Sequence, residues 1–538
     1  MFHDFLHEES WFVVLLARTG VVKDIPGDFS AVMKTLLNVF FDPQGHDMSR
    51  SGISLRLHNS DLIRVFVKLG VVLADEAALH AFYACKGSGG LKPCMMCVNV
   101  FNRKIRPGII SSDTTGFAQT HTCHESSKLQ LHTSETISEI MRMLAASINT
   151  MSKAAFNELQ TRLGWNYTEN GIMREQRLRS IVDPAEHSMY DWMHCFFVSG
   201  VFNIHSGKMM EALKPHNITY AVLHDYLSCW VWPRRVRTSS GTQVCCPKRA
   251  EASWKDGTLK CTASEGLSLV PVLANFMASI AEATPNQEIK QHAICFLKLV
   301  KVVELILRVA RCSVRAQELD DATCDYLLTF KGLYGEDCMV IKFHYILHFA
   351  LYVRRWGILP NCFVHERKHR LPKRYGNEVK NTTAEWEASV LREVTCKHIH
   401  NLSSDEALFE TNCMLIDPCP PRSAVHKFLL DEFGAADFGE AKEARINAWE
   451  KVHRHDVVEL RIDGAVAVGQ ICLLASVAQG DDNFCAVGVD LFKEQSDHSR
   501  SKKWQRSGAV HLGLLSNIRC ALIWSESAGV ITTLKPNL

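Results

Sequence analysis

Two short motifs constrain the fold of this chain more than any other feature of its sequence. Cys94 and Cys97 form a C-x-x-C pair near the start, and His344 and His348 form an H-x-x-x-H pair well past the middle. Two thiolates at this spacing can supply one edge of a zinc tetrahedron, and two imidazoles at i and i+4 on one helix face can supply the other. A structural zinc ion held by all four residues would join remote parts of the chain.

An acidic residue accompanies each motif at a similar distance. Asp75 stands nineteen positions before Cys94, and Glu366 stands eighteen positions after His348. If one zinc ion joins the two motifs, both carboxylates come into the same neighbourhood. The sequence therefore predicts a carboxylate pair built from two distant segments.

The order of these residues resembles the RNase H-like catalytic core of cut-and-paste DNA transposases. The CACTA (En/Spm-like) group and its wider relatives, which include the recombination-activating recombinase of immune cells, are most similar. Asp191 and His194 match the D-x-x-H signature of that family, and His365 stands where the family has Phe. The stretches that carry the resemblance are 71–77, 87–97, 190–194 and 361–375.

The resemblance implies metal-dependent DNA cleavage and strand transfer. Two magnesium or manganese ions can activate a water and stabilise the leaving 3′ oxygen, and such ions take oxygen ligands. By resemblance, Asp75 is the second member of the acidic triad and Glu366 is the third. Asp4, Asp24 and Asp28 are the acids available for the first position, but none stands in a family motif. We therefore expect the chain to begin after the first strand of the core, which would leave it weakly active or inactive.

Basic residues follow Glu366 closely, so this segment is the best candidate for contact with DNA phosphates. These DNA-binding candidates are Arg367, Lys368, Arg370, Lys373 and Arg374. Two other basic clusters, at 234–237 and 354–355, are equally typical of a solvated surface.

The expected fold class is α/β. Residues 1–199 would form the first part of an RNase H-like core, and 200–340 a mostly helical insertion. Residues 341–430 would complete the core, and a helical linker over 431–455 would lead to a small all-β domain at 456–538. Alternating short apolar runs with turn residues predict the strands of that domain.

Three further segments have clear patterns. The apolar run 11–17 predicts a buried strand, although a buried helix segment has the same pattern. The alternation over 63–69 predicts a strand leading towards Asp75. The three-and-four spacing of apolar residues over 287–312 predicts a long helix with one buried face.

Composition limits the remaining possibilities. With 538 residues, 47% apolar and 22% charged, the chain should form two or three globular domains. No apolar run reaches membrane-spanning length, and the first residues lack the basic start of a signal peptide. Twenty cysteines without such a signal indicate reduced thiols. We expect a nuclear or cytoplasmic protein that is not secreted and has no membrane partner.

Each candidate residue also has an ordinary structural role. Asp75 could cap a helix that begins at Glu76. His344 and His348 could be packed core histidines, and Glu366 could form a surface ion pair. The C-x-x-C pair could be a coincidence in a cysteine-rich chain.

Two function classes therefore remain open. One is a DNA transposase core that acts as nuclease and strand transferase, with DNA and a second copy of itself as partners. The other is a non-catalytic, zinc-stabilised remnant that binds DNA or a protein. In either class, Asp191 and His194 are expected to form a structural hydrogen-bonded pair, since the D-x-x-H signature lies outside the acidic triad.

Overall fold

The structure is a computed structural model of the whole chain. It describes residues 10–535 except for ten short internal segments. These are 57–60, 106–115, 234–235, 237–240, 311–312, 380–384, 405–412, 435–436, 448–449 and 480–481. Asp4 and the basic cluster at 234–237, apart from Val236, lie outside the described residues.

A pair of short parallel strands lies at the centre of the N-terminal half. β3 (Val72–Ala74) pairs with β6 (Ser188–Tyr190), so segments more than a hundred positions apart become neighbours. Each strand leads directly into a helix, α3 (Glu76–Tyr83) after β3 and α8 (Trp192–Phe197) after β6. Because the strands are parallel, both strand-to-helix turns lie at the same edge.

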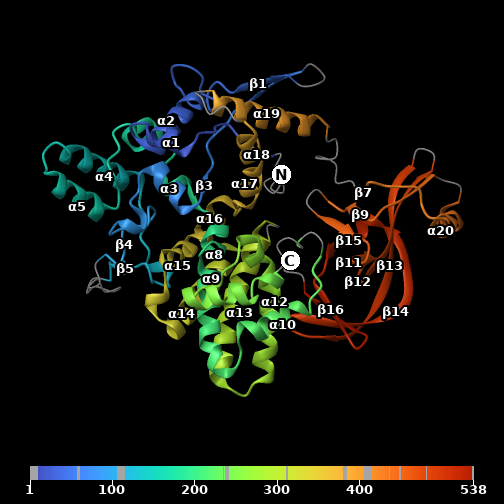
Figure 1. The fold of residues 1–538 in the computed structure, drawn as a ribbon. Coiled ribbons are helices and arrows are strands. Elements are labelled where there is room, and N and C mark those ends of the chain that lie inside the picture. The colour runs from blue at the N-terminus through green and yellow to red at the C-terminus, as the bar shows by residue number, and fades with distance from the viewer. Residues whose placement is uncertain are drawn as a thin grey trace.

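An exposed hairpin precedes this pair. β1 (Ile53–Arg56) and β2 (Leu62–Val65) are antiparallel, and all four residues of β2 are exposed. The predicted strand at 63–69 is thus shorter than expected and lies on the surface. Figure 1 shows the hairpin projecting from the top of the molecule.

The prediction of a buried strand at 11–17 is wrong. This segment has no regular secondary structure, and about half of its residues are exposed. It lies instead against C-terminal helices of the core: the Trp11 ring packs edge-on against His365 at 4.3 Å. Arg18 donates a hydrogen bond of 2.6 Å to Glu387. The aromatic and apolar side chains that suggested a strand therefore make side-chain contacts with helices.

Smaller helices complete this half of the molecule. The helical residues between 134 and 163 form two separate helices, and Ser152 caps the second by accepting from the backbone N–H of Ala155. These helices are α1 (Thr19–Lys23), α2 (Asp28–Phe40), α4 (Ser134–Ser147), α5 (Lys153–Leu163), α6 (Gln176–Ile181) and α7 (Pro184–His187), with a two-stranded parallel pair of β4 (Val100–Phe101) and β5 (Gln119–Thr120).

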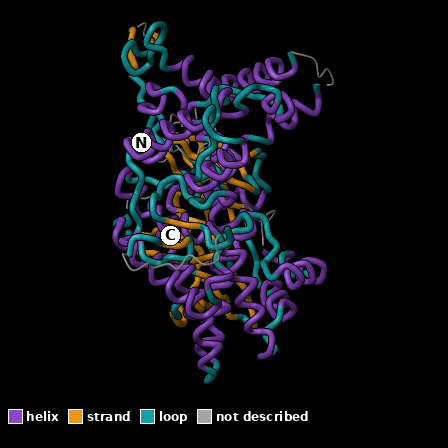
Figure 2. The backbone as a smooth tube through the Cα atoms, turned by 90° about the vertical axis from the view of Figure 1, so that its left-hand side faces the viewer, coloured by secondary structure: helices purple, strands orange, loops and turns teal. Residues whose placement is uncertain are grey.

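A helical bundle follows β6 and α8. Its longest member, α13 (Gln287–Val309), begins at the cap Asn286 and buries Ile289, Phe296 and Val303 on one face, as the apolar spacing predicts. In Figure 1 the bundle forms the lower part of the molecule, and Figure 2 shows its helices at the same end from the side. The other helices are α9 (Val201–Leu213), α10 (Tyr220–Ser228), α11 (Pro247–Asp256), α12 (Ala263–Ala283) and α14 (Ala316–Tyr334).

One helix of this bundle is unexpectedly apolar. α12 is long and apolar enough to cross a membrane by length and composition, and 56% of its most apolar stretch is buried inside the protein. A core helix with many apolar neighbours has the same properties, so α12 carries no conclusion about membranes.

The bundle also contains a fully buried histidine that should make its stability depend on pH. Burial, with the nearby His292, lowers the pKa of His205 from 6.5 to about 3. Between these two pKa values His205 is protonated in the unfolded chain but neutral in the folded chain. The free energy of unfolding therefore decreases as the pH falls below about 6.5. One such group contributes at most about 1.4 kcal/mol per pH unit. Thermal unfolding between pH 7.5 and 4 should show this loss, and His205→Phe should reduce its slope; equal slopes would contradict the assignment.

The chain then returns to the parallel pair through a series of helices. Their order places the predicted H-x-x-x-H motif at a junction between an α-helix and a single 3-10 turn, and it places Glu366 in the second helix after that turn. The elements are α15 (Ile341–Tyr345), the 3-10 turn Ile346–His348, α16 (Phe349–Trp356), α17 (Phe363–Lys368), α18 (Arg370–Glu378) and α19 (Trp386–Ser404).

The C-terminal part is an antiparallel sheet, as predicted, but it begins earlier. The expected helical linker at 431–455 is wrong: a helix, α20 (Ser423–Phe433), ends there and three strands follow. β8 (Asp437–Glu440) pairs with β12 (Ala465–Gln479), and β9 (Glu443–Arg445) pairs with β10 (Lys451–His453) and β7 (Met414–Ile416). These polar segments satisfy their backbone groups by pairing with one another, as β9 does with β10, and with β7 and β12.

The main sheet of this part has the order β15-β11-β12-β13-β14-β17-β16. In Figure 1 it stands beside the bundle, and the backbones of Val231 and Trp524 pair across the junction. Arg500 also forms an ion pair with Glu304 of α13. Its strands are β11 (Val457–Ile462), β12 (Ala465–Gln479), β13 (Asp482–Asp497), β14 (Ser501–Leu514), β15 (Ile518–Ala521), β16 (Trp524–Ser527) and β17 (Val530–Leu534).

Candidate metal centre and acidic pocket

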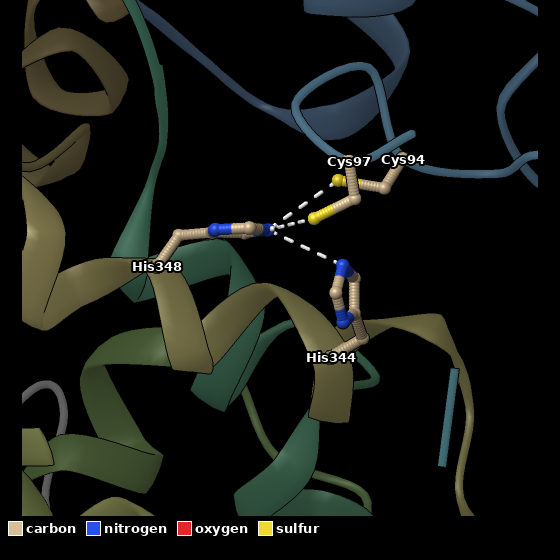
Figure 3. Close-up of side chains that lie close together, drawn as sticks. All are labelled: Cys94, Cys97, His344 and His348. Atoms are coloured by element: carbon tan, nitrogen blue, oxygen red, sulfur yellow. Dashed lines mark hydrogen bonds between the residues drawn. The ribbon is translucent and has the colours of Figure 1, made fainter. Parts of the chain in front are cut away.

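The two metal-ligand motifs converge on one point, although the bundle separates them in sequence. The potential ligand atoms of Cys94, Cys97, His344 and His348 all lie within 4.8 Å of one another, and all four residues are buried (Figure 3). Nε2 of His348 lies 3.4 Å from Sγ of Cys94, 3.7 Å from Sγ of Cys97 and 3.2 Å from Nε2 of His344.

These separations fit one tetrahedral zinc ion. With Zn–S about 2.3 Å and Zn–N about 2.0–2.1 Å, a tetrahedron has S···N edges of about 3.6 Å and an N···N edge of about 3.3 Å. If the two cysteines lay near the two histidines only by chance, the distances between their ligand atoms would not be expected to match both the S···N and the N···N edges of such a tetrahedron. The cluster is therefore able to hold a metal such as zinc.

Electrostatics support the same conclusion. Burial raises the pKa of a thiol, but the hydrogen bond from Cys97 and the neighbouring His348 and His344 hold the pKa of Cys94 well below its ordinary value. Burial and the charge of Cys94 raise the pKa of Cys97. A thiolate among imidazoles in a buried site is the environment in which a zinc ion displaces the remaining proton.

Aromatic side chains support the cluster from outside. The Tyr190 hydroxyl donates to Sγ of Cys94 at 3.9 Å, and its ring stacks on Tyr345 with centroids 3.8 Å apart. Tyr190 is the last residue of β6, directly before Asp191. Tyr190, which contacts the metal-ligand cluster, is thus the neighbour in sequence of Asp191, which lies at the edge of the parallel strands.

The strand edge presents two aspartates. Oδ1 of Asp75 accepts from the backbone N–H of Ala78 at 2.7 Å, so Asp75 is the N-cap of α3, which is one of the roles that the sequence allows. Its other oxygen accepts no hydrogen bond from the residues that the structure describes. Asp191 caps α8 in the same way, and its backbone N–H donates to the carbonyl of Ala74 at 3.3 Å.

Asp191 is a saturated, fully buried carboxylate. Oδ1 accepts from the backbone N–H groups of Met193 at 3.3 Å and Cys362 at 3.0 Å. Oδ2 accepts from the backbone N–H of His194 at 3.0 Å and from its Nδ1 at 2.5 Å. The D-x-x-H pair is thus hydrogen-bonded, as expected, and also holds the chain that enters α17.

His194 connects this pair to Glu366. Nε2 of His194 lies 3.9 Å from Oε1 of Glu366, whose side chain is 54% exposed. Burial opposes protonation of His194, but the hydrogen bond from its ring to Asp191 and the charges of Asp191, Asp75 and Glu366 raise its pKa. Asp75 and Glu366 therefore both lie close enough to act on this imidazole.

A cavity of about 380 Å³ opens at the same edge. Asp75, Asp191 and His194 line it, together with Glu76, which the sequence analysis did not single out. Burial raises the pKa of Glu76, although the Tyr345 hydroxyl donates to it at 3.0 Å. Its position directly after Asp75 at a helix start was the signal that could have identified it.

The basic candidates occupy α17 and α18, next to Glu366. Arg367, Arg370, Lys373 and Arg374 are exposed, and Arg374 pairs with Glu378 at 3.2 Å. Lys368 differs: it is buried, and its Nζ lies 2.9 Å from Nδ1 of His398. Four of the five basic candidates are thus exposed to solvent, and Lys368 is not.

No model of a known protein family matches this chain, and no curated protein matches it at a significant level. The geometry of its own residues is therefore the basis for a function.

Proposed function

We propose that this protein is a transposase-derived DNA-binding protein of the CACTA type, built on an RNase H-like core. The observation that carries the proposal is the convergence of both pairs of motif residues: the zinc ligands on one point, and Asp75 and Glu366 around His194. Four weak motifs that are far apart in sequence have no other evident reason to occupy one small region.

The residues present fit a hard divalent cation. Asp75 has an oxygen without a hydrogen bond from described residues, and Glu366 is half exposed, so both carboxylates can reach an ion from solvent. When bound, magnesium or manganese would polarise a phosphodiester and lower the pKa of a water. The chain itself orients the acids through the helix caps and through the hydrogen bonds of Asp191.

One observation favours the second function, DNA binding without efficient cleavage. Of the other carboxylates that line the cavity, Asp191 already accepts four hydrogen bonds, and Glu76 accepts one from Tyr345 while burial raises its pKa. Each is therefore a poor third acidic ligand for a pair of ions. Binding without efficient cleavage is the form of the function that we propose.

The first test concerns the basic surface beside Glu366. Replacing both Arg370 and Lys373 with Ala should weaken binding to duplex DNA about tenfold at moderate salt and reduce the slope of log K against log salt by about 1–2, because each phosphate contact contributes roughly 0.9 to that slope. Lys427→Ala, an exposed lysine on α20, is the matched control. Fluorescence anisotropy at several salt concentrations measures both quantities. An unchanged slope in the double variant would exclude this surface.

A further inference from the structure

The β1–β2 hairpin, which projects from the top of the molecule in Figure 1, carries several large apolar side chains that are open to solvent. They belong to the two strands and to the residue that directly follows β2. These exposed residues are Leu55, Leu62, Ile63, Val65 and Phe66. A two-stranded hairpin gains little stability from such side chains unless something covers them. Their concentration on one projecting element therefore indicates an interaction surface.

The two faces of the hairpin differ in chemistry and in exposure. Leu55 lies opposite Ile63, and Ile53 lies opposite Val65, so these four apolar side chains share one face. None of them is more than 45% exposed. This face is the more covered of the two.

The other face, which we call the open face, combines arginines with apolar side chains. Ser54 lies opposite Arg64, and Arg56 lies opposite Leu62, so these four share that face. Leu62 is 66% exposed, and Phe66, two positions after Arg64, is 59% exposed. Both arginines are exposed, and no carboxylate of the described residues pairs with either of them.

This combination suits an unpaired nucleic-acid strand. A guanidinium contacts phosphates, and an aromatic ring stacks on the face of a base. In a duplex the faces of the bases are covered by their neighbours, whereas in a single strand they are accessible. An acidic protein surface would neutralise the arginines but would leave the apolar side chains between them without an apolar partner.

We propose that the open face of the β1–β2 hairpin binds single-stranded DNA, with a base stacked on Phe66, a second base against Leu62, and phosphates held by Arg56 and Arg64. The two arginines are diagonal neighbours across the strand pair, about 7–8 Å apart at the backbone, so both can reach one stretch of DNA backbone. The inference rests on the proposed function and deepens it, because it adds an unpaired strand to the duplex that we propose α17 and α18 bind.

The test uses the full chain, with a fluorescent oligothymidine and a duplex as probes. Phe66→Ala should weaken oligothymidine binding at least about fivefold, because stacking of a base on an aromatic ring contributes that much, and it should leave duplex binding unchanged. Phe66→Tyr retains a ring that can stack and should retain the affinity. Replacing both Arg56 and Arg64 with Gln should reduce the slope of log K against log salt by about 1.4, since each phosphate contact on a single strand contributes about 0.7.

A cross-linking measurement needs no variant. An oligothymidine that carries 5-iodouracil should cross-link to the hairpin of the unmodified chain on illumination, with Phe66 among the modified residues. Peptide mass spectrometry identifies the position.

Val510→Ala is the matched control, because Val510 of β14 is an apolar strand residue that is 60% exposed. It should bind oligothymidine as the unmodified chain does. Unchanged oligothymidine affinity in Phe66→Ala, an equal loss of duplex binding, or cross-links confined to other segments would each overturn the hairpin site. Oligothymidine binding without duplex binding would instead contradict the proposed function and leave the hairpin site standing.

Discussion

Replacing Cys97 with Ala should remove one zinc ion per chain and destabilise the region around the parallel strands. All four ligands are buried, and they join a loop of the N-terminal half to the helices that follow the bundle. The binding energy of a structural zinc ion contributes directly to folding, so we expect a loss of about 4–5 kcal/mol or more. Native mass spectrometry measures the zinc, and hydrogen–deuterium exchange over 88–101 and 341–353 measures the local opening.

Cys85→Ala is the matched control for this experiment. Cys85 is another buried thiol near Cys94, but it lies outside the ligand cluster. It should retain the zinc ion and most of the exchange protection. Retention of zinc by Cys97→Ala, or its loss from Cys85→Ala, would show that the cluster does not hold the metal.

Supercoiled plasmid should be bound by the protein but nicked little or not at all in magnesium. Asp75 and Glu366, the two acids of the proposed site, can hold at most one ion, whereas cleavage by a metal pair needs carboxylates that bridge or hold both ions. Magnesium sites with few protein ligands are poorly populated at ordinary concentrations. Binding should weaken steeply with salt, because we propose that the exposed arginines and lysine of α17 and α18 contact phosphates.

The matched comparison is Glu366→Ala in magnesium and in manganese. We expect no difference in magnesium and at most a small excess of nicking by the unmodified chain in manganese. Strong nicking in magnesium that disappears in Glu366→Ala would contradict the proposed weak activity. It would mean that another residue completes the acidic site; Glu76→Gln would then test the nearest candidate.

The Cys/His cluster and the acidic pocket are connected through two residues that are adjacent in sequence. Tyr190 donates to the thiol of Cys94, and the next residue, Asp191, orients His194. Loss of zinc should therefore disturb the acidic pocket as well as the metal centre. This connection was not visible in the sequence, where Tyr190 and Cys94 are almost a hundred positions apart.

Local patterns predicted much of the secondary structure. The apolar spacing of α13 specifies which of its faces is buried, and short apolar runs between turn residues predicted strands where β12 and β13 form. The failures lie at 11–17 and 431–455, where the local pattern was compatible with more than one structure. Packing against α17 and α19 decided the outcome in the first case, and strand pairing, both between β9 and β10 and with β7 and β12, decided it in the second.

The sequence by itself supplied the candidate ligands of this protein: two thiols and two imidazoles at spacings suited to a metal ion, and two carboxylates that we propose as ligands of a second ion. Only the tertiary structure decided which of these groups meet and what else joins them. The hydrogen bonds of Asp191, the direction of His194 and the burial of Glu76 and Lys368 depend on contacts between segments that are remote in the chain. Such contacts arise from the packing of α8, α15 and α17 around the parallel strands, and no local pattern of residues records them.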